Sequence, residues 1–279
     1  MKEKILIINA DDFGLHKDIN LGIARTIESG MVRNVSISSC GKAYEHGISL
    51  QNHLKSVDIG VHITLVGEKP ISYQGEVKSL VNINNLFVPG FKEFSIKYFL
   101  GKLNFDEVYL ESKRQIERVF ESGLTPVHLD SHQHIHILPK VWDIFCQLAI
   151  EFNIPFIRLS TFNNLIGNRK LRDIIMAYGC NILTKIDKFK SSTGEINLMP
   201  TIGLAIAGKL TAEKLQNLLK SVKPGVVELV IHPGNQTPEL ENYYPWNYNW
   251  QEEQKALTDT KILSEIESKN IKLGKFTEI

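Results

Sequence analysis

The stretch Lys4-Ile5-Leu6-Ile7-Ile8-Asn9-Ala10-Asp11-Asp12-Phe13-Gly14 is the first sign of the fold, and the rest of the sequence repeats its pattern. Its first part, Lys4–Asn9, has the apolar pattern of a buried strand, and polar residues follow it at once. The next segment, Lys17–Ser29, has helical spacing and is followed by Gly30, a residue type favoured just after a helix. A strand, a polar turn and a helix in this order predict one unit of a parallel sheet covered by helices.

The same order of strand and helix recurs along the chain. Further strands are predicted over Asn34–Ser39, Val57–Leu65, Pro126–His132, Phe156–Ser160 and Val226–His232, and further helices over Gly41–Leu54, Phe105–Ser122, Lys140–Phe152, Thr211–Ser221 and Gln251–Lys269. The apolar stretch 203–208 is interpreted as another buried strand. Roughly seven such units fit a chain close to the ~250 residues of a (β/α)8 barrel. We therefore expect an α/β fold, a deformed TIM-like barrel, with a doubly wound open sheet as the alternative.

Nothing in the sequence marks a boundary between domains. There is no Ser-, Gly- or Pro-rich linker, no long block of charge and no internal repeat, so we expect a single catalytic domain over residues 1–279. Two regions, 66–104 and 161–200, interrupt the order of strands and helices and are too long to be plain connections. We interpret both as excursions over one face that form part of a substrate cleft.

The composition is that of an ordinary globular protein, with 43% hydrophobic and 23% charged residues. Lysine and arginine total 32 against 31 aspartates and glutamates, and this net charge of +1 disfavours nucleic acid as a partner. No apolar stretch reaches the ~20 residues of a membrane helix, and the apolar run at the start is too short for a signal-peptide core. The 3 cysteines, far apart, disfavour a disulfide framework or a cysteine zinc site. We expect a cytoplasmic protein that binds neither nucleic acid nor membrane.

Polar side chains gather where four predicted strands end, which is where parallel α/β proteins collect ligands and catalytic groups. Asp11 and Asp12 follow the first strand. Two adjacent carboxylates repel each other, so a cation or a shared proton would stabilise them. A turn that leads into the following helix is the alternative interpretation.

The stretch 128–136 carries a histidine or aspartate at every second position. These residues are His128, Asp130, His132, His134 and His136, and in an extended strand all five would share one face. Eight residues at ~3.3 Å each cover about 26 Å, whereas metal ligands lie ~2 Å from the ion. One residue of the run, or at most two neighbours, can therefore bind a given ion. The others are expected to support the ligands, contact a substrate or form ordinary hydrogen bonds.

Two more histidines lie at the ends of predicted strands. His62 stands between Val61 and Ile63, where a histidine buried in the core is the alternative to a ligand. His232 precedes a Pro-Gly turn, where it suits a general acid or base, or alternatively a cap.

One carboxylate and two imidazoles form a mixed site for a divalent metal that activates water or polarises a carbonyl. A second carboxylate can accept the proton of the water, and a further histidine can protonate a leaving group. This set of groups suits hydrolysis of an amide or an ester. Non-haem iron oxygenases use the same ligands, so the ligand types alone do not decide the reaction.

Taken together, five segments resemble the YdjC/ChbG family of carbohydrate deacetylases. They are NADDFG at Asn9–Gly14, GVHITL at Gly60–Leu65, HLDSHQHIH at His128–His136, the pair Ile157-Arg158, and ELVIHPG at Glu228–Gly234. The resemblance spans nearly the whole chain. It implies a bacterial metal-dependent enzyme that removes N-acetyl groups from sugars such as chitooligosaccharides, in chitin degradation, on the deformed TIM-like barrel of the polysaccharide deacetylases. A homodimer is expected by the same resemblance.

The resemblance also implies roles for individual residues. Asp12, His62 and His132 would bind the metal, Asp11 would be the general base and His232 the general acid. The family implies magnesium as the single divalent ion, whereas two imidazoles favour a softer ion such as zinc or cobalt.

Supporting and substrate-binding roles follow. Asp130 is expected to orient a ligand imidazole and Arg158 to hold Asp11, with a plain structural ion pair as the alternative for Arg158. His134, and Tyr244 and Trp246 in the aromatic segment 243–250, are expected to contact the sugar. The alternative is a loop that buries its aromatic side chains on the barrel or at a subunit interface.

The same residues are compatible with two other functions. One is another metal-dependent barrel enzyme, a sugar isomerase or an oxygenase with the same ligands. The other is a carbohydrate-binding protein without catalysis, although sugar binding alone does not need a base beside a metal.

Overall fold

The computed structural model describes residues 3–161, 181 and 196–279. Its strands are β1 Lys4–Phe13, β2 Asn34–Ile37, β3 Asp58–Ile63, β4 His128–Ser131, β5 Phe156–Leu159, β6 Asn197–Ile202, β7 Gly225–Ile231 and β8 Ile271–Leu273. They follow the order β2-β3-β4-β5-β6-β7-β1-β8, and β1 also pairs with β2. Strands β1 to β7 therefore close into a parallel barrel, which confirms the predicted TIM-like fold and excludes the open sheet.

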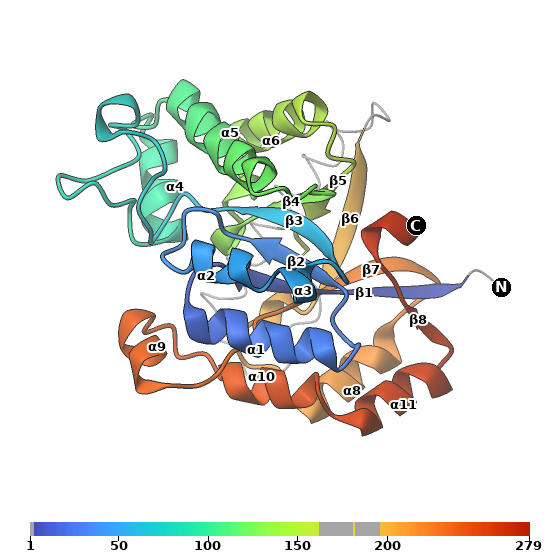
Figure 1. Cartoon of the computed structure of the whole chain (residues 1–279). Coiled ribbons are helices and arrows are strands. Elements are labelled where there is room, and N and C mark those ends of the chain that lie inside the picture. The colour runs from blue at the N-terminus through green and yellow to red at the C-terminus, as the bar shows by residue number, and fades with distance from the viewer. Residues whose placement is uncertain (1–2, 162–180, 182–195) are drawn as a thin grey trace.

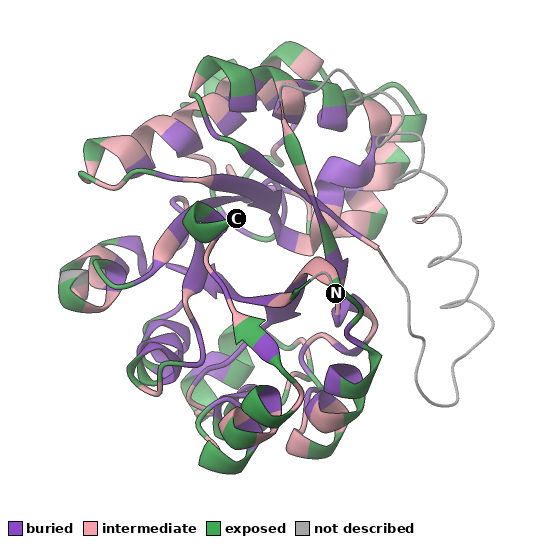
Figure 2. Cartoon of the chain, turned by 90° about the vertical axis from the view of Figure 1, so that its right-hand side faces the viewer, coloured by how far each residue is buried: buried purple, intermediate pink, exposed green. Residues whose placement is uncertain are grey.

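Helices surround this barrel on the outside, with buried strands in the middle (Figure 2). They are α1 Lys17–Glu28, α2 Tyr44–Ser49, α3 Gln51–Leu54, α4 Phe91–Phe99, α5 Phe105–Glu121, α6 Pro139–Glu151, α8 Ala212–Ser221, α9 Pro238–Tyr243, α10 Trp250–Ala256 and α11 Thr260–Ser268. Among the described residues, no helix combines the length and apolar character needed to cross a membrane.

The barrel is deformed where β1 meets its neighbours. One edge of β1 pairs with β7 over Lys4–Ala10. The other edge pairs with β8 over its first residues and with β2 only from Asn9 onward. Strand β8, which the sequence did not predict, thus fills the gap that β2 leaves. The Asn34 side chain stabilises the junction of β1, β2 and β8 by donating hydrogen bonds to the carbonyl oxygens of Ile8 and Gly274.

A bulge at the end of β1 aims two adjacent acids into the barrel mouth. Between Ala10 and Phe13 strand β1 advances by one residue more than its partner β2. Side chains alternate faces along a regular strand, so Asp11 and Asp12 would otherwise point in opposite directions. The extra residue, with Asp12 at a φ of 70°, brings both carboxylates into the interior, where each side chain is about 1% exposed.

The strand predicted over Pro126–His132 is present as β4, but the extended conformation does not continue through residues 128–136. Strand β4 ends at Ser131, and 3₁₀ turns follow over His132–Ile137, with Gln133 and His134 in the left-handed region at φ 52° and 56°. The chain has to turn here because α6 begins at Pro139. The alternate positions therefore do not share one face.

Three other predicted elements differ from the structure. Residues 203–208 form a 3₁₀ turn over Leu204–Ile206 and not a strand. The predicted helices 41–54 and 251–269 are each divided into two shorter helices, α2 with α3 and α10 with α11. Hydrophobic spacing continues across such breaks because both parts pack on the same barrel, so periodicity alone does not find them.

The region 66–104 contains a 3₁₀ turn at Gln74–Glu76 and helix α4. It is held by α5, where the buried Glu111 carboxylate accepts hydrogen bonds from the backbone of Ile71 and Ser72. Of the region 161–200, most lies outside the described residues, and its end belongs to β6, which pairs with β5 and β7.

Helix α1 packs closely against the turn that follows β7. A substitution at this contact therefore tests the packing at the barrel mouth. A Cβ added at Gly22 would lie 2.2 Å from the Cα of Gly234, a backbone atom that cannot swing away. We expect Gly22→Ala to lower the free energy of unfolding by ~1–3 kcal/mol, measured by urea denaturation. Gly75→Ala is the matched control, because its Cβ would meet only ordinary contacts with Tyr73. Equal stability of the two variants would contradict this packing.

Candidate metal centre

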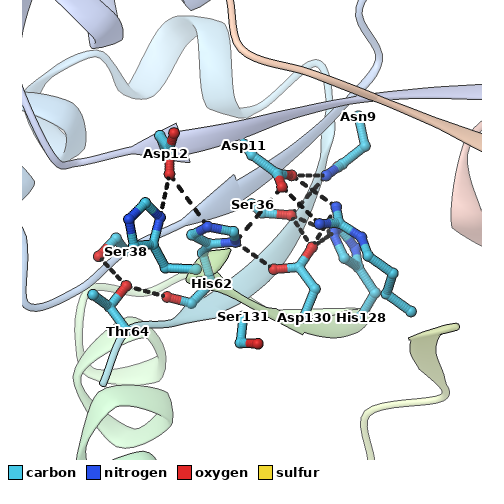
Figure 3. Close-up of polar contacts among 12 residues, drawn as sticks. Asn9, Asp11, Asp12, Ser36, Ser38, His62, Thr64, His128, Asp130 and Ser131 are labelled. Atoms are coloured by element: carbon cyan, nitrogen blue, oxygen red, sulfur yellow. Dashed lines mark hydrogen bonds and ion pairs between the residues drawn. The ribbon is translucent and has the colours of Figure 1, made fainter. Parts of the chain in front are cut away.

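Two histidines and an aspartate from three different segments meet at the carboxyl ends of the strands. Nδ1 of His132 lies 2.9 Å from Oδ1 of Asp12, and Nε2 of His62 lies 3.3 Å from the same oxygen. One ligand atom of each residue falls within 4.8 Å of the other two, and all three residues are buried. Figure 3 shows the ring of His62 between Asp12 and Asp130. The three residues that the resemblance implied as ligands are thus brought together.

The donor set fits a divalent metal. Oδ2 of Asp12 is buried and has no hydrogen-bond partner within the described chain. A buried carboxylate oxygen without a partner is costly unless a cation satisfies it. Burial alone would raise the pKa of Asp12, but His132 and His62 hold it well below its usual range, so Asp12 is ionised.

A second group of three, Asp11, His62 and Asp130, is equally compact. The guanidinium of Arg158 already contacts both of its carboxylates, at 2.6 Å from Oδ2 of Asp11 and 2.6 Å from Oδ2 of Asp130. The first group, with its unpartnered oxygen, is therefore the better metal site.

Asp130 fixes the orientation of the His62 ring. Its Oδ1 lies 2.6 Å from Nδ1 of His62, and its Oδ2 accepts a hydrogen bond from Ser36. With Nδ1 engaged, Nε2 faces Asp12. Burial opposes protonation of His62, but the charges of Asp130 and Asp11 raise its pKa to about 10. The pocket therefore has a surplus of negative charge that favours a cation.

Arg158 contacts residues next to the candidate ligands and links four strands of the barrel. It makes a bidentate contact with Asp11, at 2.6 and 2.7 Å, and it also contacts Asp130 and Glu228. The arginine is 1% exposed. The expected contact between Arg158 and Asp11 is present, and it is one part of a larger buried cluster. Asn9 adds a further hydrogen bond to Asp11 at 2.9 Å.

The remaining histidines of the 128–136 run lie outside the candidate ligand set. Nε2 of His128 lies 3.0 Å from the hydroxyl of Ser36, and burial lowers the pKa of His128 to about 3. His136 is held between Ser131 and the carbonyl of Arg158, and burial lowers its pKa to about 3 as well. Both are neutral, structural histidines. Nδ1 of His134 lies 3.3 Å from the hydroxyl of Ser160, and its contact with a sugar stays a prediction.

His232 follows β7 at the barrel mouth and is 7% exposed. Its backbone N–H donates to Glu253 at 2.6 Å, and the same carboxylate accepts from the backbone of Leu210. Nδ1 of His232 is buried and has no hydrogen-bond partner within the described chain. Because Nδ1 is enclosed by the protein, a hydrogen bond between this ring and a ligand would have to involve Nε2.

The aromatic segment 243–250 packs partly on the barrel, as its alternative interpretation held. Tyr244 is 5% exposed, and its hydroxyl donates to Glu68 and the carbonyl of Leu15. Trp246 is half-buried, and its ring centre lies 5.2 Å from that of His132. Trp246 is therefore the better placed of the two predicted sugar contacts.

Three buried glutamates near the site had no assigned role from the sequence, namely Glu68, Glu228 and Glu253. Glu228 had a visible signal, because a charged residue inside the apolar strand 226–231 needs a buried partner. Glu68 and Glu253 lie in irregular and helical segments without such a contrast, so only the structure finds them.

The protein is a parallel (β/α) barrel with a buried Asp-His-His group at its mouth that could hold a metal ion. Comparison with known proteins makes this specific. The family model described as YdjC-like protein matches residues 5–268. The chain belongs to the YdjC-like family, which confirms the resemblance found in its sequence.

The relatives are carbohydrate deacetylases by name. A carbohydrate deacetylase of Thermoanaerobacter pseudethanolicus is 30% identical over 275 residues, covering 98% of each chain. A chitooligosaccharide deacetylase of Serratia marcescens is 34% identical over 154 residues, 55% of this chain and 58% of the relative. A solved structure described as a putative cellobiose-phosphate cleavage protein of Enterococcus faecalis has a TM-score of 0.79 at 24% identity, over 99% of this chain and 98% of the other, and shows the same fold.

The buried Glu228 predicts a pH-dependent stability. Burial raises its pKa to about 7 from an ordinary value of 4.5, although Arg158 opposes the shift. The folded protein then holds this proton more tightly than the unfolded chain, so its stability falls as the pH rises through this range. We expect Glu228→Gln, which cannot titrate, to gain stability relative to the unmodified protein between about pH 5 and pH 8, measured by urea denaturation.

The exposed Glu213 provides the control. Glu213→Gln should leave the pH dependence unchanged. A stability difference for Glu228→Gln that stays constant with pH would contradict the raised pKa.

Proposed function

We propose that this enzyme hydrolyses the acetamide of N-acetylated amino sugars such as chitooligosaccharides, with a divalent metal ion bound by Asp12, His62 and His132. The observation that carries the proposal is the unpartnered, buried oxygen of Asp12 beside two imidazoles. The names of the relatives supply the substrate class. A metal in this position would polarise the acetyl carbonyl and lower the pKa of a water molecule.

Asp11 is the proposed general base. Its contacts with Arg158 fix the orientation of the carboxylate, and Oδ2, which accepts only one hydrogen bond, retains a lone pair for a proton, whereas Oδ1 accepts from both Arg158 and Asn9. Asp11 accepts a proton from the water whose oxygen attacks the acetyl carbon. Asp130 and Arg158 act through their neighbours, since Asp130 orients His62 and Arg158 holds Asp11.

His232 is the proposed general acid. The carbon–nitrogen bond breaks as His232 donates a proton to the departing nitrogen, so that acetate and a free sugar amine are formed. The hydrogen bond from its backbone N–H to Glu253 fixes the position of the residue. Nε2 is the ring nitrogen proposed to donate the proton, because Nδ1 is enclosed by the protein. Acetate release separates this function from isomerisation, oxygenation and simple sugar binding, because only deacetylation produces acetate.

Several finer points of the proposal rest on the resemblance to the family. They are magnesium as the metal, a homodimer and a part in chitin degradation; the proposed cytoplasmic location rests instead on the composition and the short apolar run at the start. Two imidazole ligands favour zinc or cobalt over magnesium on chemical grounds. Elemental analysis of the purified protein decides between these ions.

Replacement of the base tests the mechanism directly. We expect Asp11→Asn to lower kcat for acetate release by about 10²- to 10⁴-fold, since the amide cannot accept the proton of the water. The metal content should stay close to that of the unmodified protein. Asp106→Asn, on the exposed first turn of α5, is the control and should keep full activity. Unchanged turnover by Asp11→Asn would show that another group is the base.

Removal of a ligand tests the site itself. We expect His132→Ala to lose the bound metal, measured by elemental analysis after gel filtration, and acetate release with it. His53→Ala removes an imidazole that contacts Glu28 far from the pocket and should retain the metal. Full metal retention by His132→Ala would refute the ligand set.

A further inference from the structure

The ring of Tyr248 lies beside the proposed general acid. Tyr248 belongs to the segment that joins α9 to α10, and α9 lies at the end of the barrel away from the two chain termini (Figure 1). Its ring meets that of His232 edge-on, with 5.4 Å between the ring centres and 71° between the planes. The ring of Trp246 lies 5.5 Å from Tyr248 and 5.2 Å from His132. Tyr248 is therefore next to the proposed acid and one ring away from a candidate metal ligand.

The hydroxyl of Tyr248 differs from that of the nearby Tyr244 in its contacts. The Tyr244 hydroxyl donates to Glu68 and to the carbonyl of Leu15, whereas the Tyr248 hydroxyl has no hydrogen-bond partner among the residues that the structure describes. A phenol in a half-buried position generally finds a partner. The Tyr248 hydroxyl can therefore donate its hydrogen bond to a bound ligand.

The surroundings of Tyr248 keep its hydroxyl protonated. Burial raises its pKa well above the usual range, and the negative charges of Asp12, Glu253 and Asp11 raise it further. These carboxylates are those of a candidate ligand, of the residue that holds the backbone of His232, and of the proposed base. The phenol thus lies within electrostatic reach of the site and is a neutral hydrogen-bond donor there.

Gly208 leaves the space that this ring occupies. It follows the 3₁₀ turn Leu204–Ile206, its φ is 69°, and a Cβ added to it would lie 2.1 Å from Cδ1 of Tyr248. The backbone N–H of Asn249 donates to the carbonyl of Gly208 at 2.7 Å and holds the two segments together. The buried ring of Trp250 lies 5.7 Å from that of Tyr248. Close packing therefore fixes the ring, as a preorganised donor requires.

Hydrolysis of an acetamide needs a donor near this position. The acetamide has to lie between Asp11, which accepts the proton of the water, and His232, which protonates the departing nitrogen. As the water oxygen bonds to the acetyl carbon, an electron pair of the C=O bond moves onto the acetyl oxygen. A fixed donor beside that oxygen stabilises the transition state more than the ground state, because the negative charge develops only in the reaction.

We propose that Tyr248 is a further catalytic residue, whose hydroxyl donates a hydrogen bond to the acetyl oxygen as that oxygen becomes negative. Tyr248 gives up no proton and takes none. Gly208 is a positioning residue, which acts by leaving room for the ring. The inference rests on the proposed function, because it takes the acetamide as the reacting group.

Tyr248→Phe keeps the ring and removes only the donor. We expect kcat for acetate release from the trimer of N-acetylglucosamine to fall by about 10²-fold, with KM within about twofold of that of the unmodified enzyme. The metal content, measured by elemental analysis, and the midpoints of the pH profile of kcat should stay the same, because Tyr248 exchanges no proton. Tyr109→Phe is the control, since it removes a hydroxyl that contacts Glu151 on the outside of the barrel, and it should keep full activity.

Gly208→Ala tests the positioning of the ring. It should also lower kcat, and adding it to Tyr248→Phe should lower kcat by no more than about a further twofold, because both changes remove the same hydrogen bond. Gly123→Ala is the matched control: its φ is 77° and nothing lies within 4 Å of its added Cβ, so it has the left-handed strain without the collision and should keep full kcat. Losses that multiply in the double variant would overturn the role of Gly208.

Several results would overturn the role of Tyr248. Unchanged kcat in Tyr248→Phe would do so, and a rise in KM alone would make the hydroxyl a ground-state contact. A shifted midpoint in the pH profile would mean that Tyr248 acts through the titration of His232, and loss of the metal would make its role structural.

Failure of the proposed function gives a different result. If the unmodified enzyme releases no acetate, the proposed function falls and this inference falls with it. If the unmodified enzyme and Tyr248→Phe release acetate equally fast, only this inference falls.

Discussion

The buried guanidinium of Arg158 is the interaction on which the mouth of this barrel depends. It contacts Asp11 from β1, Asp130 from β4 and Glu228 from β7, and it comes itself from β5. Carboxylates so close together repel one another, and each would be costly to bury alone. One planar cation with several donors satisfies them together. The charge cluster therefore ties four strands at the level where the candidate ligands lie.

The candidate metal ligands are connected to this cluster by successive contacts. Arg158 holds Asp130, Asp130 orients the His62 ring, and the ring then faces Asp12. Histidine ligands generally need such a partner on their second nitrogen to fix the ring. The same environment explains why the buried histidines differ, because His62 lies among acids while His128 faces a serine and stays neutral. Supporting residues thus decide which histidine can take part in chemistry.

Two irregular backbone segments complete the site. The bulge in β1 turns Asp12 toward the same interior as Asp11. After β4, the left-handed residues Gln133 and His134 turn the chain. The Gln133 side chain then contacts the start of α4, so the region 66–104 lies beside the candidate metal centre. Backbone in such conformations persists only where the surroundings enforce it, and functional sites are where it gathers.

From the sequence, a barrel could be predicted, with an open sheet as the alternative, and Asp11, Asp12, His62 and His132 could be placed at strand ends, because apolar periodicity and polar residues at strand ends are local patterns. The sequence pattern did not reveal the bulge in β1, strand β6 or the added strand β8, since these depend on how strands from distant parts of the chain meet. Which histidines lie beside acids, and the contact of Glu228 with Arg158, became visible only in the folded chain. Contacts between residues far apart in sequence set those environments, and no spacing along one chain encodes them.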